Sequence, residues 1–184
     1  ARKFGRKVIF EDTTQTQGFK SDGYYDSEGN IHLDYDNVKP LEWILKHELT
    51  HFGEGTDAYN EYVDLLRKTT AYKQWLQKEL RTDEESLGKL EGLMRQKIMK
   101  EREAVAPVSP IEAQAEIIAN FSATFAFAKD SRGVEALTAD MSLKEHNAFV
   151  QFIIDFISYL KKKLGGSNKT LTKELSVCQK SFVN

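Results

Sequence analysis

The sequence predicts an α+β fold in which a small N-terminal β-sheet precedes a mainly helical body. Segments before residue 36 have the character of short strands, whereas most of the chain after residue 40 has the 3.6-residue periodicity of helices. The chain has 184 residues, a length that fits one domain and is sufficient to bury a core without disulfide bonds. We therefore expect a single domain over residues 1–166, followed by a polar C-terminal tail over residues 167–184.

The expected strands rest on short apolar segments and on alternation. Residues 7–12 have the composition of a short strand. Residues 23–35 predict a hairpin with a turn at 27–30, because apolar and polar residues alternate over 31–35. This last strand is a candidate edge strand, a position at which an extended peptide can bind by adding a strand.

The expected helices are indicated by apolar residues at helical spacing. They cover residues 41–52, 57–80, 83–103, 111–129 and 142–164. Gly53 and Gly55 end the first of them. Pro107 and Pro110 bracket a loop, and Pro110 suits the first turn of the helix that follows.

Composition and charge exclude several classes of function. The formal net charge of −2 gives no basic footprint for nucleic acid, and no apolar run reaches the ~18 residues of a membrane span. Cys178 is the only cysteine, which excludes an internal disulfide framework and a thiolate zinc site. The N-terminus lacks both a signal-peptide apolar stretch and a start methionine. We therefore expect no nucleic-acid or membrane partner, favour a cytoplasmic location and interpret the chain as part of a longer polypeptide.

Residues 47–51, with the sequence His-Glu-Leu-Thr-His, form the motif that carries chemistry. Residues four apart lie on one face of a helix, so His47 and His51 present two imidazoles to one point. Such a pair suits two of the four tetrahedral positions around zinc. Glu48 can lie beside the metal and take a proton from a water molecule that the metal activates. The helical surroundings favour a zinc site over a coincidental match.

The third ligand is expected to be acidic, because only His32 and His146 remain as further histidines. Catalytic zinc usually has three protein ligands and one open position. Glu112, Glu116 and Asn120 follow one another at four-residue intervals on the fourth helix, flanked by alanines that allow close approach of another helix. A carboxylate among apolar residues is costly unless it is paired or bound to metal. If the register of the helix differs by one turn, Glu112 takes the place of Glu116 as the third ligand. Otherwise its carboxylate places negative charge near a helix N-terminus.

Other acidic residues follow the motif closely. Glu54, Asp57 and Glu61 are alternative third ligands, and the Gly-Thr pair before Asp57 resembles the aspzincins, whose third ligand is an Asp in that position. However, Asp57 comes only six residues after His51, a short distance in which to turn back. We interpret Asp57 as the cap of the next helix.

The two motifs together resemble the gluzincin pattern. In that family a glutamate on a second helix, here Glu116, is the third ligand, and the residue four later, usually Asp, steadies a ligating histidine. The sequence segments at residues 47–56 and 116–121 resemble more closely those of the compact minigluzincin-like domains in very large proteins from bacterial mobile elements and phages. The resemblance covers roughly residues 29–164.

The resemblance implies a zincin-type helical body with zinc as the cofactor and a protein or peptide as the substrate. It assigns His47, His51 and Glu116 as the ligands and Glu48 as the general base. The sequence departs from the family in two respects. Asn120 stands where Asp is usual, which leaves the residue behind the ligand uncharged, and the segment between the motifs contains additional helix.

The expected reaction is therefore zinc-dependent hydrolysis of peptide bonds by a gluzincin-type endopeptidase. His146, on the last helix, is a candidate donor to the oxyanion of a tetrahedral intermediate, and Tyr59 is a second. Either side chain can instead be a packing or surface residue. The alternative functions are a non-catalytic zinc-stabilised interaction module of a larger mobile-element protein, or a peptidase that is autoinhibited without its parent chain.

Overall fold

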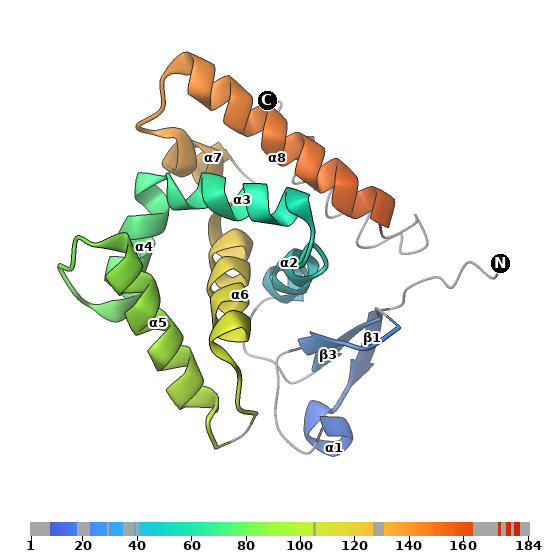
Figure 1. The fold of residues 1–184 in the computed structure, drawn as a ribbon. Helices are drawn as coiled ribbons and strands as arrows, with labels where there is room; N and C mark the ends of the chain where they lie inside the picture. Colours follow the sequence, from blue (N-terminus) through green and yellow to red (C-terminus); the bar gives the residue numbers. More distant parts are fainter. Residues whose placement is uncertain are drawn as a thin grey trace.

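The computed structural model describes residues 8–17, 23–28, 30–34, 39, 41–104, 106–126, 131–163, 173, 176–177 and 179–180. The architecture is α+β, as the periodicity predicted. A three-stranded sheet lies beside α2 (Leu41–His51), and the helices that follow α2 in the chain form a larger helical body (Figure 1). Within the described part of the chain, no helix is both long and apolar enough to cross a membrane.

The sheet contains β1 (Val8–Glu11), β2 (Gly23–Tyr25) and β3 (Ile31–Asp34) in the order β1-β3-β2. β1 runs parallel to β3, and β2 is antiparallel to β3 as the predicted hairpin requires. The expectation that the strand from residue 31 is an edge strand is wrong, because β3 is paired on both sides. A short helix, α1 (Thr13–Gln17), between β1 and β2 was not predicted.

His32 joins the three strands through its two ring nitrogens. Its Nδ1 lies 3.1 Å from Glu11 Oε2 of β1, and its Nε2 lies 3.1 Å from Asp26 Oδ2, directly after β2. The ring stacks on Tyr24, with centroids 4.4 Å apart. Asp26 also accepts hydrogen bonds from the backbone and side-chain amides of Asn30. These contacts give His32 a structural role in the sheet.

Replacing Asp26 by Asn is expected to lower the free energy of unfolding by about 2 kcal/mol at pH 7, the scale of hydrogen bonds to a charged group. Burial opposes ionisation, but hydrogen bonds from Asn30, His32 and the Glu28 backbone hold the pKa of Asp26 well below its ordinary value. The stabilisation is therefore present above about pH 4 and lost as the pH falls through the folded-state pKa. Denaturant unfolding at pH 7 and pH 3 measures this, and the difference between the two proteins should be smaller at pH 3 than at pH 7. Glu28→Gln is the control in the same turn, and an equal loss in both variants would contradict the prediction.

The chain reverses direction after α2 through residues 52–56. Gly55 has a φ of +75°, a left-handed conformation that favours glycine. A Cβ at Gly53 would lie 3.2 Å from both Tyr59 and Phe156, so this position requires close backbone approach. Thr56, whose side chain accepts a hydrogen bond from the Tyr59 backbone, caps the next helix. The predicted cap, Asp57, is instead the first helical residue.

The segment predicted as helix over residues 57–80 is divided into α3 (Asp57–Arg67) and α4 (Thr70–Leu80). Thr69 causes the division: its hydroxyl donates to the carbonyl of Leu66 at 2.7 Å and accepts from the Tyr72 backbone amide at 3.2 Å. One side chain therefore satisfies backbone groups at the end of one helix and at the start of the next.

The second half of the chain contains α5 (Leu87–Arg102), α6 (Pro110–Phe121), α7 (Ser131–Thr138) and α8 (Leu143–Lys163). α6 ends earlier than predicted and continues as a π-helical turn, η1 (Ser122–Ala126), whereas residues 127–129 of the predicted helix lie outside the described residues. α7 was not predicted. In the predicted C-terminal tail, Gln179 donates to Ser158 Oγ of α8 at 2.8 Å.

α6 is central in the helical body and is held on several sides (Figure 1). It contacts α2, α5 and η1, and its Ile117, Ile118 and Phe121 are at most 1% exposed. The buried carboxylate of Glu91 on α5 accepts from Gln114 of α6 at 3.3 Å. The same oxygen of Glu91 accepts from α3 and α4, through Arg67 Nε at 2.8 Å and Tyr72 Oη at 2.9 Å. This network fixes α6 relative to three neighbouring helices.

Candidate metal centre

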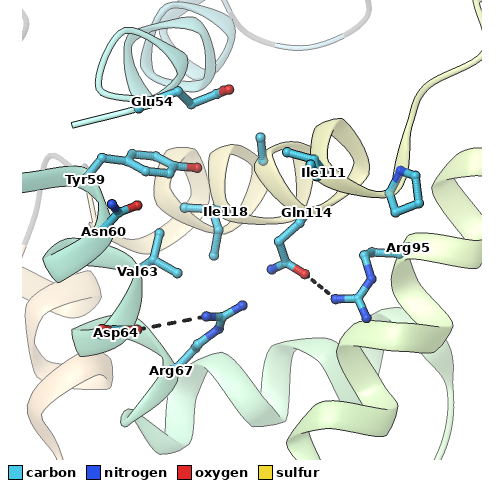
Figure 2. Close-up of a pocket in the computed structure, with 13 residues that line it drawn as sticks. Glu54, Tyr59, Asn60, Val63, Asp64, Arg67, Arg95, Ile111, Gln114 and Ile118 are labelled. Carbon is cyan, nitrogen blue, oxygen red and sulfur yellow. Dashed lines mark hydrogen bonds and ion pairs between the residues drawn. The ribbon is translucent and has the colours of Figure 1, made fainter. Parts of the chain in front are cut away.

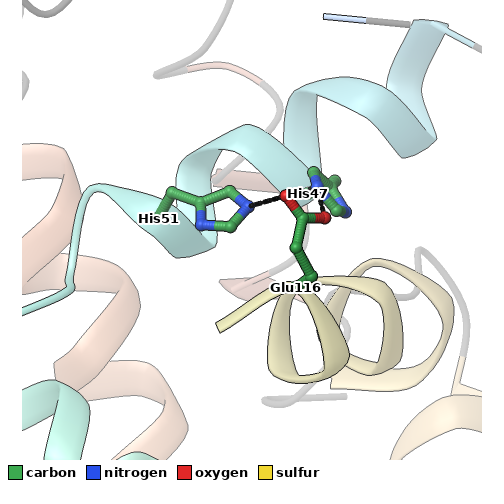
Figure 3. A group of neighbouring side chains, drawn as sticks. All are labelled: His47, His51 and Glu116. Carbon is green, nitrogen blue, oxygen red and sulfur yellow. Dashed lines mark hydrogen bonds and ion pairs between the residues drawn. The ribbon is translucent and has the colours of Figure 1, made fainter. Parts of the chain in front are cut away.

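His47 and His51 on α2 meet Glu116 on α6 at one point (Figure 3). The two Nε2 atoms are 3.2 Å apart. Glu116 Oε2 lies 3.3 Å from His47 Nε2, and Glu116 Oε1 lies 3.9 Å from His51 Nε2. These are the three residues that the sequence predicted as ligands, and their donor atoms all lie within 4.8 Å of one another.

This spacing fits a tetrahedral metal ion. Metal–ligand bonds of 2.0–2.2 Å at tetrahedral angles place neighbouring donor atoms about 3.3–3.6 Å apart. The distances of 3.2 and 3.3 Å from His47 Nε2 are close to this spacing, and the 3.9 Å between Glu116 Oε1 and His51 Nε2 is longer. Two imidazole nitrogens and one carboxylate oxygen form a donor set that zinc commonly adopts in catalytic sites. The described residues could therefore hold a metal ion, and they leave a fourth position open.

The local sequence explains why the ligands converge. Ile44 and Leu49 are at most 1% exposed and anchor α2 in the core, and Ile44 precedes His47 by three residues and His51 by seven, so both histidines lie on the same side of α2 as this core residue. The ring of Trp43 stacks on that of His47, with centroids 5.3 Å apart, and its Nε1 donates to Thr124 Oγ1 of η1 at 3.2 Å. Trp43 thus links α2 to the segment that continues α6.

Glu48 lies beside the cluster. Its Oε1 is 4.0 Å from His47 Nε2, and it lines a pocket of about 240 Å³ together with His51 and Glu116. The residue is only 5% exposed, and this burial raises the pKa of its carboxyl group. A carboxylate that is close to the donor atoms and poorly hydrated is a suitable proton acceptor for a water molecule at the open position.

The charges around the cluster favour an ionised carboxylate at the ligand position. Burial opposes the ionisation of Glu116, but the hydrogen bond with His47 and the charges of His47, His51 and Arg102 lower its pKa to about 2. His51 is also affected: burial lowers its pKa, but the hydrogen bond with Glu54 and the nearby charge of Glu48 produce a net increase.

Two residues of the centre were not predicted in the roles that the structure gives them. Glu54, considered only as a third ligand, contacts His51 Nδ1, the ring nitrogen that faces away from the cluster. Arg102, at the end of α5, donates from Nη1 to Glu116 Oε1 at 2.9 Å and lines the same pocket. Glu54 could have been found from the sequence, because it is an acidic residue three positions after His51, the last residue of α2. No signal in the sequence distinguishes Arg102 from the other cations of its helix.

Asn120 does not have the supporting position that the resemblance implies. His47 Nδ1 is buried and has no hydrogen-bond partner among the described residues, so Asn120 does not bond to it. Asn120 lines a different pocket with Trp43 and Thr124. The ligand that has a supporting carboxylate is His51, and its partner comes from the turn after α2.

The other candidates lie elsewhere or have different partners. His146 lies on α8 beside Asn147, with Nδ1 3.4 Å from Oδ1, and is not among the residues that line the pocket of the centre. Tyr59 and Glu61 on α3 do not line it either. Glu112 does line it, but its carboxylate accepts from the Ser109 backbone at 2.7 Å in a capping box.

Glu54→Ala is expected to weaken zinc binding by about 10- to 100-fold, the usual cost of losing a carboxylate that supports a ligating histidine. The contact with Glu54 fixes the orientation of the His51 ring and leaves Nε2 directed at the cluster. Competition with a chromogenic chelator measures the affinity. Glu61→Ala, an exposed carboxylate on the next helix, is the control and should leave the affinity unchanged. Equal affinities for Glu54→Ala and wild type would contradict the supporting role.

Comparisons with family models, curated proteins and solved structures find no match to this chain. The resemblance to gluzincins therefore receives no support from them. What the chain does must be inferred from the geometry of the centre itself.

Proposed function

We propose that this chain is a zinc-dependent metallopeptidase of the gluzincin type, which hydrolyses peptide bonds with Glu48 as the general base. The observation that carries the proposal is the arrangement of His47, His51 and Glu116 at tetrahedral spacing beside a buried carboxylate. Metal ligands alone are compatible with a structural site. A poorly hydrated acid adjoining an open coordination position is what metal-assisted hydrolysis requires.

In the proposed reaction, zinc would supply a Lewis acid that activates water and polarises the peptide carbonyl. Glu48 accepts a proton from the attacking water and delivers it to the amide nitrogen as the C–N bond breaks. His47, His51 and Glu116 would hold the metal. Arg102 holds Glu116 and is the candidate for stabilising the negative charge on the carbonyl oxygen, the role that the sequence suggested for His146.

The test of this proposal is zinc-dependent cleavage of a defined peptide mixture. The zinc-loaded protein is incubated with a pool of acetylated random octapeptides, and the products are analysed by mass spectrometry. We expect cleavage that stops when a chelator removes the zinc and returns when zinc is restored. Zinc binding by a protein that leaves the pool intact would overturn the peptidase proposal and support a zinc-stabilised interaction module.

A further inference from the structure

A groove adjoins the candidate metal centre along α6 (Figure 2). It has a volume of about 690 Å³ and is bounded by α3, α5, α6 and the turn at Glu54. Glu54 and Ala115 line both this groove and the pocket of the metal centre. The two cavities are therefore neighbours, with Glu54 and Ala115 between them.

The floor of the groove is apolar. Val63 of α3 and Ile118 of α6 lie in it, and Tyr59 extends along one side (Figure 2). Ile111 lines the groove and is 82% exposed. An apolar cleft with a few directed polar groups is typical of a ligand-binding site.

Two guanidinium groups enter the groove, but their pairing differs. Arg67 Nε forms an ion pair with Glu91 at 2.8 Å, and Arg67 Nη1 lies 4.0 Å from Asp64. Arg95 Nη1 donates to the neutral side chain of Gln114 at 2.6 Å, and no carboxylate of the described residues forms an ion pair with Arg95. Arg95 therefore lacks the direct acidic partners that Arg67 has.

Charged side chains lie on different sides of the groove. Glu54, on the side of the metal centre, lies across the groove from Arg95, and Arg67 lies on the same far side (Figure 2). A carboxylate bound near Glu54 would be repelled, whereas a carboxylate near Arg95 would meet a planar donor group suited to two parallel hydrogen bonds. A peptide that enters the groove from the centre would thus carry its negative charge at the far end.

We propose that this groove binds the peptide chain on one side of the scissile bond and that Arg95 selects a carboxylate there. The carboxylate comes from an acidic side chain or from the C-terminus of the peptide. This inference rests on the proposed function, because a substrate chain must leave the metal centre through a neighbouring cavity. It adds the substrate class, which is peptides with an acidic residue or a free C-terminus near the cleavage point.

The test measures binding rather than cleavage, with the zinc-loaded Glu48→Gln variant. The probes are fluorescein-labelled octapeptide pools that contain either Glu or Gln at one fixed position, each with a free or an amidated C-terminus. We expect about tenfold tighter binding of the carboxylate-bearing pools, the scale of one hydrogen bond between charged groups. Preference for Glu indicates a side-chain carboxylate, and preference for the free terminus indicates the C-terminus.

Variants of Arg95 connect the preference to the groove. In the Glu48→Gln background, Arg95→Gln is expected to abolish the preference, and Arg95→Glu to reverse it, so that pools without the carboxylate bind more tightly. Lys97→Gln is the matched control, because Lys97 is an exposed cation on the same helix that lines a different pocket. Thermal unfolding confirms that each variant is folded.

The outcomes separate this inference from the proposed function. Equal binding of all pools, no binding of any pool, or a preference that persists in Arg95→Gln would overturn the role of the groove, whether or not the wild type hydrolyses peptides. A preference that depends on Arg95, in a protein whose wild type cleaves nothing, would support the groove and contradict only the peptidase proposal.

Discussion

Replacing Glu116 by Ala is expected to reduce zinc affinity by at least about 10²-fold. Zinc binding at sites with four protein ligands releases roughly 10–16 kcal/mol, so one ligand accounts for about 3 kcal/mol. Glu116 supplies the only carboxylate oxygens of the cluster, 3.3 Å from His47 Nε2 and 3.9 Å from His51 Nε2. Its loss also leaves Arg102 without its 2.9 Å partner, so a positive charge remains beside the metal position. Competition with a chromogenic chelator at neutral pH measures the affinity.

Glu112→Ala is the matched control for this measurement. Glu112 lies one turn earlier on α6 and lines the same pocket, but its carboxylate accepts from the Ser109 backbone. We expect zinc affinity close to that of the wild type and a loss of about 1 kcal/mol in stability, because the capping box is broken. Equal zinc loss in the two variants, or full retention in Glu116→Ala, would contradict the assignment of Glu116 as the third ligand.

The ligands differ in how directly the sequence predicts them. His47 and His51 belong to one helix, and helical geometry alone places residues four apart on the same face. Glu116 requires that two helices pack with its face toward α2. The alanines on α6 indicated this packing, and Ala113 and Ala119 are fully buried. The four-residue spacing between Glu116 and Asn120 did not predict the surroundings of Asn120 correctly. Asn120 lies one turn further along the axis of α6 than Glu116, in the pocket lined by Trp43.

Contacts that depend on loops and on distant elements could not be predicted. Arg102 reaches Glu116 because the chain reverses between α5 and α6, and no periodicity encodes the direction of that reversal. The parallel pairing of β1 with β3 joins segments more than twenty residues apart, across a helix that was not predicted. Local signals were also missed, since Thr69 divides a continuous helical pattern through its hydroxyl group. Periodicity therefore predicted the fold class but not the partners of the site residues.

Glu48→Gln is expected to reduce the rate of peptide hydrolysis by about 10²- to 10⁴-fold, the range attributed to general acid–base catalysis. Glutamine has nearly the same shape but cannot accept the proton of the attacking water. Glu48 is 5% exposed and lies 4.0 Å from His47 Nε2, so a water molecule from bulk solvent has little access to replace it. The measurement is the initial rate of cleavage of the random octapeptide pool by zinc-loaded protein.

Zinc content decides how the loss in Glu48→Gln is interpreted. Glu48 is beside the donor cluster but is not a member of it, so the variant should bind zinc about as tightly as the wild type. Glu112→Gln, in the same pocket, should retain most of the activity because its carboxylate is used in helix capping. Hydrolysis that continues at the wild-type rate in a zinc-loaded Glu48→Gln protein would rule out Glu48 as the base. A loss of rate that accompanies a loss of zinc would instead make Glu48 part of the metal site, because only a ligand or its support changes the two quantities together.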